Sequence, residues 1–245
     1  MTPEQLPLLT AAVLLVAFLY SSVGHAGASG YIAVMSLFGL APSEIKPTAL
    51  VLNILVASIG AWQFWRAGHF SWRLFWPFAL CAIPLAFVGG SIALPTHAFK
   101  ILVGIALLFS AIRLLLRPSA DIVEGEPSRP AAFSIGATLG LLAGLTGTGG
   151  GIFLTPLLLF KKWARTKQAA AVSALFILVN SAAGLLGNVA STRRFPSFAI
   201  GLAAAAVAGG TAGSFFGSRR FDHSTIKRCL AVVLLIAGAK LVFVR

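Results

Sequence analysis

The chain has 245 residues, of which 58% are hydrophobic and only 10% charged, and its mean hydropathy is +0.93. Soluble domains carry about a quarter charged residues, so this composition excludes a soluble globular protein and predicts an all-α integral membrane protein. The net charge of +13 raises the question of nucleic-acid binding. The Lys and Arg residues, however, are scattered in short stretches between apolar segments and form no continuous stripe, so we expect no nucleic-acid partner.

Long apolar segments predict the membrane-spanning helices, because about 20 apolar residues cross the hydrocarbon core as a helix. Six segments have this length, at 46–66, 72–92, 97–117, 167–190, 196–217 and 223–244. Two further apolar regions, 5–41 and 131–162, are cut by glycine-rich breaks at 24–30 and 144–151. The polar stretch 118–130 separates a first membrane repeat, 1–117, from a second, 131–245.

The two repeats are similar in sequence. "GASGYIAVMSLF" at 27–38 aligns with "GTGGGIFLTPLL" at 147–158, an offset of 120 residues, and Lys46 then matches Lys167. "VGGSIA" at 88–93 matches "AGGTAG" at 208–213 in the same order. A nearly constant offset over several matches predicts an internal duplication.

The distribution of basic residues indicates how the repeats are oriented. If each broken region enters the membrane and returns to the same side, the halves are inverted and 13 Lys and Arg lie inside against 6 outside. If each broken region crosses fully, the halves are parallel and the division is 10 against 9. The positive-inside rule favours inverted repeats with two re-entrant elements. The parallel arrangement stays open, because residues 7–23 alone are long enough to span.

Ionisable groups are nearly absent from the predicted spans. The six acidic residues fall in termini, loops or the linker, which argues against a proton- or sodium-coupled carrier of cations. The one titratable side chain expected deep in the bundle is His25. No Ser–His–Asp set, carboxylate pair or metal-ligand spacing occurs in the apolar segments, so we expect no enzyme, cofactor or metal.

The breaks are the predicted site. A helix that begins after a glycine-rich break presents free N–H groups and the positive end of its dipole. Such half-helices are expected near 29–31 and 149–152, and in inverted repeats both point to one place near the midplane, which suits a small anion. The candidate binding residues lie in the two breaks and on two spanning helices: Ser22, His25, Gly27, Ser29, Gly30, Tyr31, Thr146, Gly147, Thr148, Gly149, Gly150, Gly151, Asn53 and Asn180.

Each of these residues has a simpler alternative role. Glycine clusters in membrane helices often serve close packing alone, and buried amides often hold helices together. His25 would in that case be a hydrogen-bonded core residue and not a proton carrier.

The breaks also carry a family resemblance. "VGHAGASGY" at 23–31 and "GLTGTGGGIFLTPLLL" at 144–159, each followed by a loop with a lysine and an Ala-rich helix, resemble the two halves of the sulfite exporter TauE/SafE family. "RAGHFSWRL" at 66–74 is similar to that family's link between helices, whereas "GHAG" at 24–27 departs from a plainer Gly-Xaa-Gly-Gly-Gly. The resemblance implies a multi-pass carrier of the bacterial inner membrane for sulfite, an organosulfonate or sulfoacetate.

We therefore expect a secondary transporter with alternating access around a midplane anion site. Transport would be coupled to a proton carried by His25 or driven by the membrane potential. The expected partners are the small anion, membrane lipid, the coupling proton and a second copy in a homodimer. Two alternatives stay open, an anion channel with the same site and a membrane scaffold subunit in which the glycines only pack.

Overall fold

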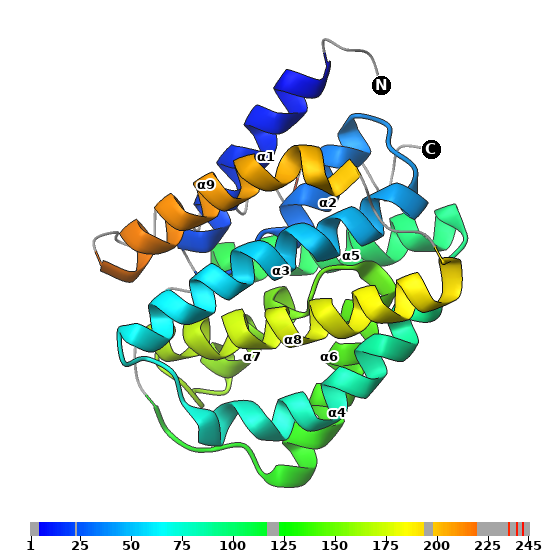
Figure 1. Ribbon diagram of the computed structural model, residues 1–245. Coiled ribbons are helices and arrows are strands. Elements are labelled where there is room, and N and C mark those ends of the chain that lie inside the picture. The colour runs from blue at the N-terminus through cyan, green and yellow to red at the C-terminus, as the bar shows by residue number, and fades with distance from the viewer. Residues whose placement is uncertain are drawn as a thin grey trace.

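The computed structural model describes residues 5–22, 24–116, 123–193 and 198–219, with single positions at 235, 239 and 242 (Figure 1). Within these residues every regular element is a helix: α1 (Gln5–Ser22), α2 (Ala28–Leu37), α3 (Pro42–Arg66), α4 (Trp72–Ser91), α5 (Thr96–Leu116), α6 (Arg129–Thr146), α7 (Gly151–Phe160), α8 (Thr166–Thr192) and α9 (Phe198–Arg219). Of these, α1, α3, α4, α8 and α9 are long and apolar enough to cross a membrane. The prediction of an all-α membrane protein is confirmed. The expected span 223–244 lies, apart from three single positions, outside the described residues.

Each broken region consists of a long helix, a short non-helical segment and a ten-residue helix. The N-cap of α2 is Gly27, with φ 105°, and the N-cap of α7 is Gly150, with φ 80°. Residues with a side chain rarely adopt this left-handed backbone, so glycine is required at both positions. The half-helices begin at Ala28 and Gly151, within one residue of the starts expected from the sequence.

The helix boundaries of the two halves correspond at an offset of 123 to 124 residues, which differs from the offset of 120 found by aligning the glycines. The N-caps Gly27 and Gly150 are 123 residues apart, and α3 and α8 begin 124 residues apart. Glycine matching had paired Gly27 with Gly147, because "GTGGG" contains several glycines that fit equally well.

The new offset changes the partner of the first lysine. Lys46 corresponds to Ala170 and not to Lys167. Gly147 packs against the backbone of Lys46 just as Gly24, 123 residues earlier, packs against Ala170. Helix order and these contacts are consistent with the predicted duplication at an offset of 123 to 124 residues, and the duplication itself stays a prediction.

The long helices α3 and α8 cross in opposite directions. Asn53 of α3 donates a hydrogen bond to Ser181 of α8, while Phe64, eleven residues later in α3, packs with Ala170, eleven residues earlier in α8. Figure 1 shows α3 and α9 running from right to left and α8 from left to right. Opposite directions for corresponding helices are what inverted repeats require, whereas parallel repeats would give the same direction.

Two helix pairs pack through glycines spaced four residues apart, and both pairs join the halves. Gly136, Gly140 and Gly144 of α6 face the backbone of Phe78, Ala82 and Ala86 in α4, and Gly209, Gly213 and Gly217 of α9 face Leu14, Phe18 and Ser22 in α1. A Cβ atom at any of these glycines would overlap a backbone carbonyl oxygen of the neighbouring helix. The spacing produces close parallel packing of the kind that small residues allow in membranes.

Substituting Gly140 with alanine should lower the free energy of unfolding by roughly 1–3 kcal/mol, because the new methyl group overlaps the backbone of Ala82. Gly201→Ala in α9 is the matched control, since nothing lies within 4 Å of its Cβ position and alanine favours the helix by up to about 1 kcal/mol. Unfolding in mixed micelles measures both. Equal stability of the two variants would contradict the close α4–α6 contact.

One end of the bundle is strongly basic. There α3 ends and α4, α6 and α8 begin, and this end, here called the basic end, carries Arg66, Arg73, Arg129, Lys161, Lys162, Arg165 and Lys167. Burial, with a smaller contribution from the charge of Lys167, lowers the pKa of His69 in the loop between α3 and α4. The imidazole is therefore neutral at pH 7 and adds no charge.

The described part of the linker, 123–128, is docked on the basic end. Glu124 forms an ion pair with Lys162, and its N–H donates to the Lys162 carbonyl at 2.9 Å. Glu126 forms an ion pair with Arg73 at 2.8 Å. The stretch that separates the repeats in sequence thus connects them in space.

Candidate functional site

The two breaks meet at Asn53, whose side chain is fully buried in the middle of α3. Its Oδ1 accepts from the Ala28 N–H, the first of α2, at 3.0 Å. Its Nδ2 donates to the Thr148 carbonyl in the second break at 3.3 Å and to the Ser181 hydroxyl of α8 at 3.2 Å. One amide therefore ties together both breaks and both crossing helices, as the predicted convergence of the breaks requires.

A second link joins the breaks through His25. Its Nε2 lies 3.2 Å from the carbonyl oxygen of Gly151, the first residue of α7. Because a carbonyl only accepts, this contact requires a proton on Nε2. The half-buried imidazole thus acts as a cross-break hydrogen-bond donor in this structure.

The hydroxyl groups proposed to hold the anion are already donating within the protein. Ser22 donates to the Leu19 carbonyl, and Ser29 donates to the Tyr20 hydroxyl at 2.9 Å. Thr146 donates to the Leu142 carbonyl at 2.7 Å, which leaves Thr148 as the donor in the 2.8 Å contact between the two threonines. Each hydroxyl has one proton, so none of these four donates to an anion unless its present bond breaks.

The remaining candidates of the first break are packed inside the bundle. The Tyr31 hydroxyl donates back to the Ala26 carbonyl at 2.8 Å. A Cβ atom at Gly30 would overlap Val16 and Tyr20, so Gly30 serves the contact between α1 and α2. The Ala28 N–H is taken by Asn53, so the donors left at this break are the N–H groups of Ser29 and Gly30, which by helix geometry lack an intrahelical partner.

The second break is packed just as closely. A Cβ atom at Gly149 would lie 2.7 Å from the Ser181 hydroxyl and 2.8 Å from Asn53 Nδ2, and one at Gly151 would overlap Ile177. At Gly150 it would lie 2.9 Å from the Phe176 ring, and φ is also positive there. A Gly150→Ala variant therefore tests the fold more than anion binding.

Sequence reasoning missed a buried cation beside the second break. We expected Lys46 in an external loop, but α3 begins at Pro42, and Lys46 is only 6% exposed. Its ammonium donates to the carbonyls of Gly89, Gly90 and Ile92, at 3.2, 2.9 and 3.0 Å, at the end of α4. Cations are favourable at helix C-termini, and this one also contacts Gly147 through its stem.

Lys46 sets the sign of the buried charge around the breaks. Among the side chains whose burial the structure describes, which leaves out Lys100 and Arg113 of α5, it is the single charged one in the buried class, and none of the carboxylates in that set is buried. The signal available in the sequence was the Ala41–Pro42 step with Glu44 in the first turn, which is typical of a helix start. The positive potential favours an anion and disfavours a cation at this place.

Asn180 of α8 has unused hydrogen-bonding capacity. Its Nδ2 donates to the Phe176 carbonyl at 2.9 Å, whereas its buried Oδ1 has no partner, and the same holds for the hydroxyls of Ser21 and Thr48. An unpaired buried polar atom costs free energy, so these three groups are exceptions to the usual pairing of buried polar atoms.

Comparison with known proteins gives the family. The family model described as sulfite exporter TauE/SafE matches residues 9–241. The chain belongs to the sulfite exporter TauE/SafE family. This TauE/SafE member is 42% identical over 240 residues to the "Probable membrane transporter protein y4hK" of Sinorhizobium fredii. The aligned region covers 96% of this chain and 97% of the relative. No solved structure matches.

Membership makes this TauE/SafE protein a multi-pass membrane transporter and not an enzyme. It confirms the resemblance seen in the two glycine-rich breaks, and it implies a small anionic substrate, a lipid environment and, in bacteria, the inner membrane.

Proposed function

We propose that the chain is a secondary transporter that moves a small sulfur-containing oxyanion, sulfite or an organosulfonate such as sulfoacetate, by alternating access. The anion is held where the two breaks meet, by N–H groups in the first turns of α2 and α7 other than that of Ala28, which donates to Asn53. The observation that carries the proposal is the charge at that place. The buried charged group beside the breaks is the cation Lys46, and both half-helices direct their positive ends to the region that Asn53 joins.

The hydrogen-bond pattern supports a revised set of anion ligands. Backbone N–H groups at Ser29 and Gly30 and at Gly149 to Ile152 are the primary donors, because the hydroxyls of the breaks are engaged elsewhere. Among the side chains, Asn180 contributes the second N–H of its Nδ2, because only one of the two protons is needed for the bond to the Phe176 carbonyl. Glycine allows the anion to approach this backbone closely.

Inverted repeats supply the mechanism of alternating access. The antiparallel crossing of α3 and α8 at Asn53 lies between the halves, so rocking about this crossing exposes the breaks to one side and then to the other. Coupling by a proton at His25 and assembly into a homodimer stay predictions.

Counterflow in proteoliposomes tests the transport proposal. Vesicles loaded with unlabelled sulfite should accumulate labelled sulfite faster than empty vesicles, because a loaded carrier returns faster than an empty one. This acceleration by sulfite inside the vesicle requires a carrier, which exposes its binding site to one side of the membrane at a time. Saturable uptake with no acceleration from the far side would support the anion channel instead. Absence of any sulfite, sulfonate or sulfoacetate flux above protein-free vesicles would contradict the proposal and leave the scaffold alternative.

A further inference from the structure

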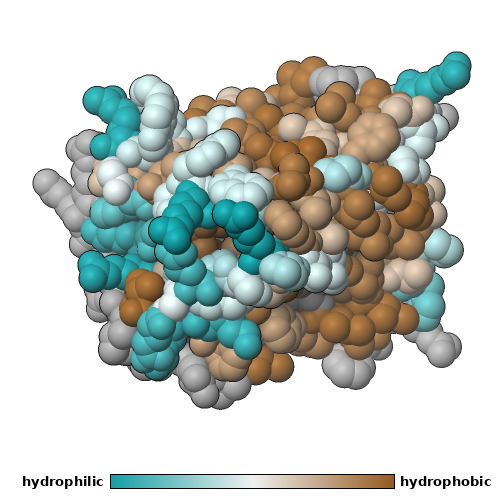
Figure 2. All heavy atoms as spheres, turned by 90° about the horizontal axis from the view of Figure 1, so that it is seen from below, coloured by the Kyte–Doolittle hydropathy of each residue, from teal (hydrophilic) through white to brown (hydrophobic). Residues whose placement is uncertain are grey.

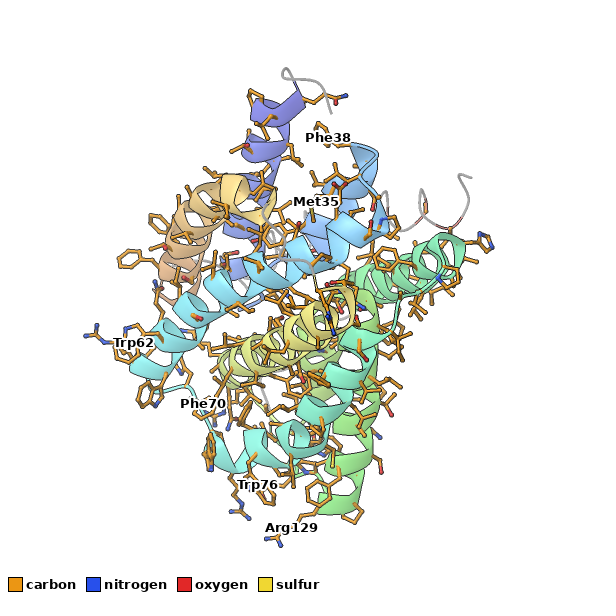
Figure 3. All side chains as sticks on the ribbon, turned by 45° about the vertical axis from the view of Figure 1, so that its right-hand side comes forward. Met35, Phe38, Trp62, Phe70, Trp76 and Arg129 are labelled. Carbon is orange, nitrogen blue, oxygen red and sulfur yellow. The ribbon has the colours of Figure 1, made fainter. Side chains whose placement is uncertain are left out.

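A cavity of about 210 Å³ opens at the basic end, far along the bundle from the breaks. Its walls come from the first turns of α4, α6 and α8 and from the docked linker. The residues that matter are Arg73, Trp76, Glu126, Arg129, Trp163 and Gln168. Figure 3 shows Trp76 and Arg129 together at this end, and Figure 2 shows hydrophilic side chains around a hollow next to a broad apolar flank. We call this cavity the interfacial pocket.

The charge of the interfacial pocket is positive. It has two guanidinium groups, from Arg73 and Arg129, and one carboxylate, from Glu126. The Arg73–Glu126 pair at 2.8 Å is exposed, 81% and 57% for the two side chains, so solvent and salt weaken it and an incoming anion can compete for the guanidinium. Arg129 lies over the Trp76 ring, 5.9 Å from its centroid, which positions the second guanidinium at the rim.

The aromatic walls of the pocket place it at the depth of lipid headgroups. Trp76 packs against Phe133 and Trp163 against Phe78, so the two indoles that line the pocket are anchored in the bundle. On the same end the side chains of Trp62, Trp65 and Trp72 are 54%, 59% and 63% exposed. Exposed tryptophans at one end of spanning helices are typical of the membrane–water interface.

We propose that the interfacial pocket binds the phosphate group of an acidic phospholipid, with Arg73 and Arg129 as its donors and with Glu126 released from Arg73. Guanidinium groups bind phosphate oxygens in a forked geometry, and basic pockets between membrane helices are suited to such headgroups. A volume of 210 Å³ is below the usual 300–1,000 Å³ of sites for drug-sized ligands, so the pocket holds a headgroup while the acyl chains lie along the apolar flank.

The bound headgroup would connect the two halves of the protein. Arg73 lies on α4 of the first half, and Arg129, at the end of the linker, is the first residue of α6, whose remaining turns belong to the second half. The linker residues Val123, Glu126 and Pro127 form part of the wall between them. The proposal rests on the pocket alone and is independent of the transported substrate.

The test measures how lipids stabilise the purified full-length protein in neutral detergent. Phosphatidylglycerol should raise the melting temperature more than phosphatidylcholine, because only the former adds net negative charge. In the Arg73→Gln, Arg129→Gln double variant the apparent affinity for phosphatidylglycerol should fall about 30-fold, since each arginine near an anionic headgroup contributes roughly fivefold. Glu126→Gln should bind several-fold tighter, because the competing carboxylate is gone.

Arg66→Gln is the matched control, since Arg66 lies at the same end over Trp62 and outside the pocket. It should leave the affinity for phosphatidylglycerol within about twofold of wild type. In a second arm of the test, the melting temperature is measured with inorganic phosphate in place of lipid. Stabilisation by phosphate alone, with no preference for phosphatidylglycerol, would overturn the lipid as the source. An equal loss in Arg66→Gln and in the double variant would overturn the pocket and leave only a general surface charge effect.

Discussion

Replacing Asn53 with aspartate should reduce sulfite transport at low substrate concentration by roughly 30-fold while the protein still folds. The substitution keeps the acceptor for the Ala28 N–H but replaces the donor to Thr148 and Ser181 with a second oxygen. A carboxylate about 8 Å from a bound anion raises the anion's free energy by roughly 2 kcal/mol at an effective dielectric constant of about 20, which corresponds to roughly 30-fold in affinity. Uptake into proteoliposomes over a range of sulfite concentrations measures the change as an increase in KM.

The matched control is Asn188→Asp, which makes the same chemical change on α8 at a half-buried position four residues before the helix ends. It should transport at close to the wild-type rate. Acidic buffer should restore part of the activity of Asn53→Asp, because protonation removes the negative charge and returns a donor. A folded Asn53→Asp protein with wild-type KM would show that the anion does not bind where the breaks meet.

Replacing Lys46 with methionine should lower sulfite affinity at least tenfold and the free energy of unfolding by roughly 1–3 kcal/mol. Methionine keeps the stem that packs against Gly147 but leaves the carbonyls of Gly89, Gly90 and Ile92 without their donor. It also removes the buried positive charge, which lies two helical turns, about 10 Å, from Asn53 along α3. The two effects are separated by measuring thermal unfolding with and without sulfite.

Lys162→Met serves as the control for Lys46→Met. Lys162 is 44% exposed in an ion pair with Glu124, and the loss of such a solvent-accessible pair changes stability by at most about 1 kcal/mol. If the melting temperature of Lys46→Met rises with sulfite as much as that of wild type, Lys46 is only a cap on α4 and the anion is held by backbone alone.

The sequence allowed the breaks to be located because their chemistry is local. Gly27 and Gly150 adopt a left-handed backbone conformation that other residues avoid. The requirement for glycine is therefore visible in the sequence as glycine clusters within apolar segments. The inverted orientation of the halves stays a prediction, which rests on charge bias in short loops and with which the opposite directions of α3 and α8 agree.

Other parts of the site depend on tertiary contacts or on the exact start of a helix. Lys46 was expected outside because the predicted span begins at residue 46, although Pro42 is well suited to the first position of a helix. The hydroxyl of Ser29 finds Tyr20 only once α1 and α2 pack, and Thr146 bonds to its own helix as threonines in helices often do. No pattern in the sequence distinguishes a hydroxyl that bonds within the protein, as these two do, from one that is free to bind an anion.

The glycine contacts of α6 with α4 and of α9 with α1 have a consequence for synthesis. Each of these contacts pairs a helix made early with one made late, and the most extensive helix contacts in the described part of the chain all join the two halves. Helices α1 and α4 therefore enter the membrane with their partner faces exposed to lipid until the later helices arrive. The halves mature together, and a chain cut in the linker should regain its packing only when both pieces are made in the same membrane.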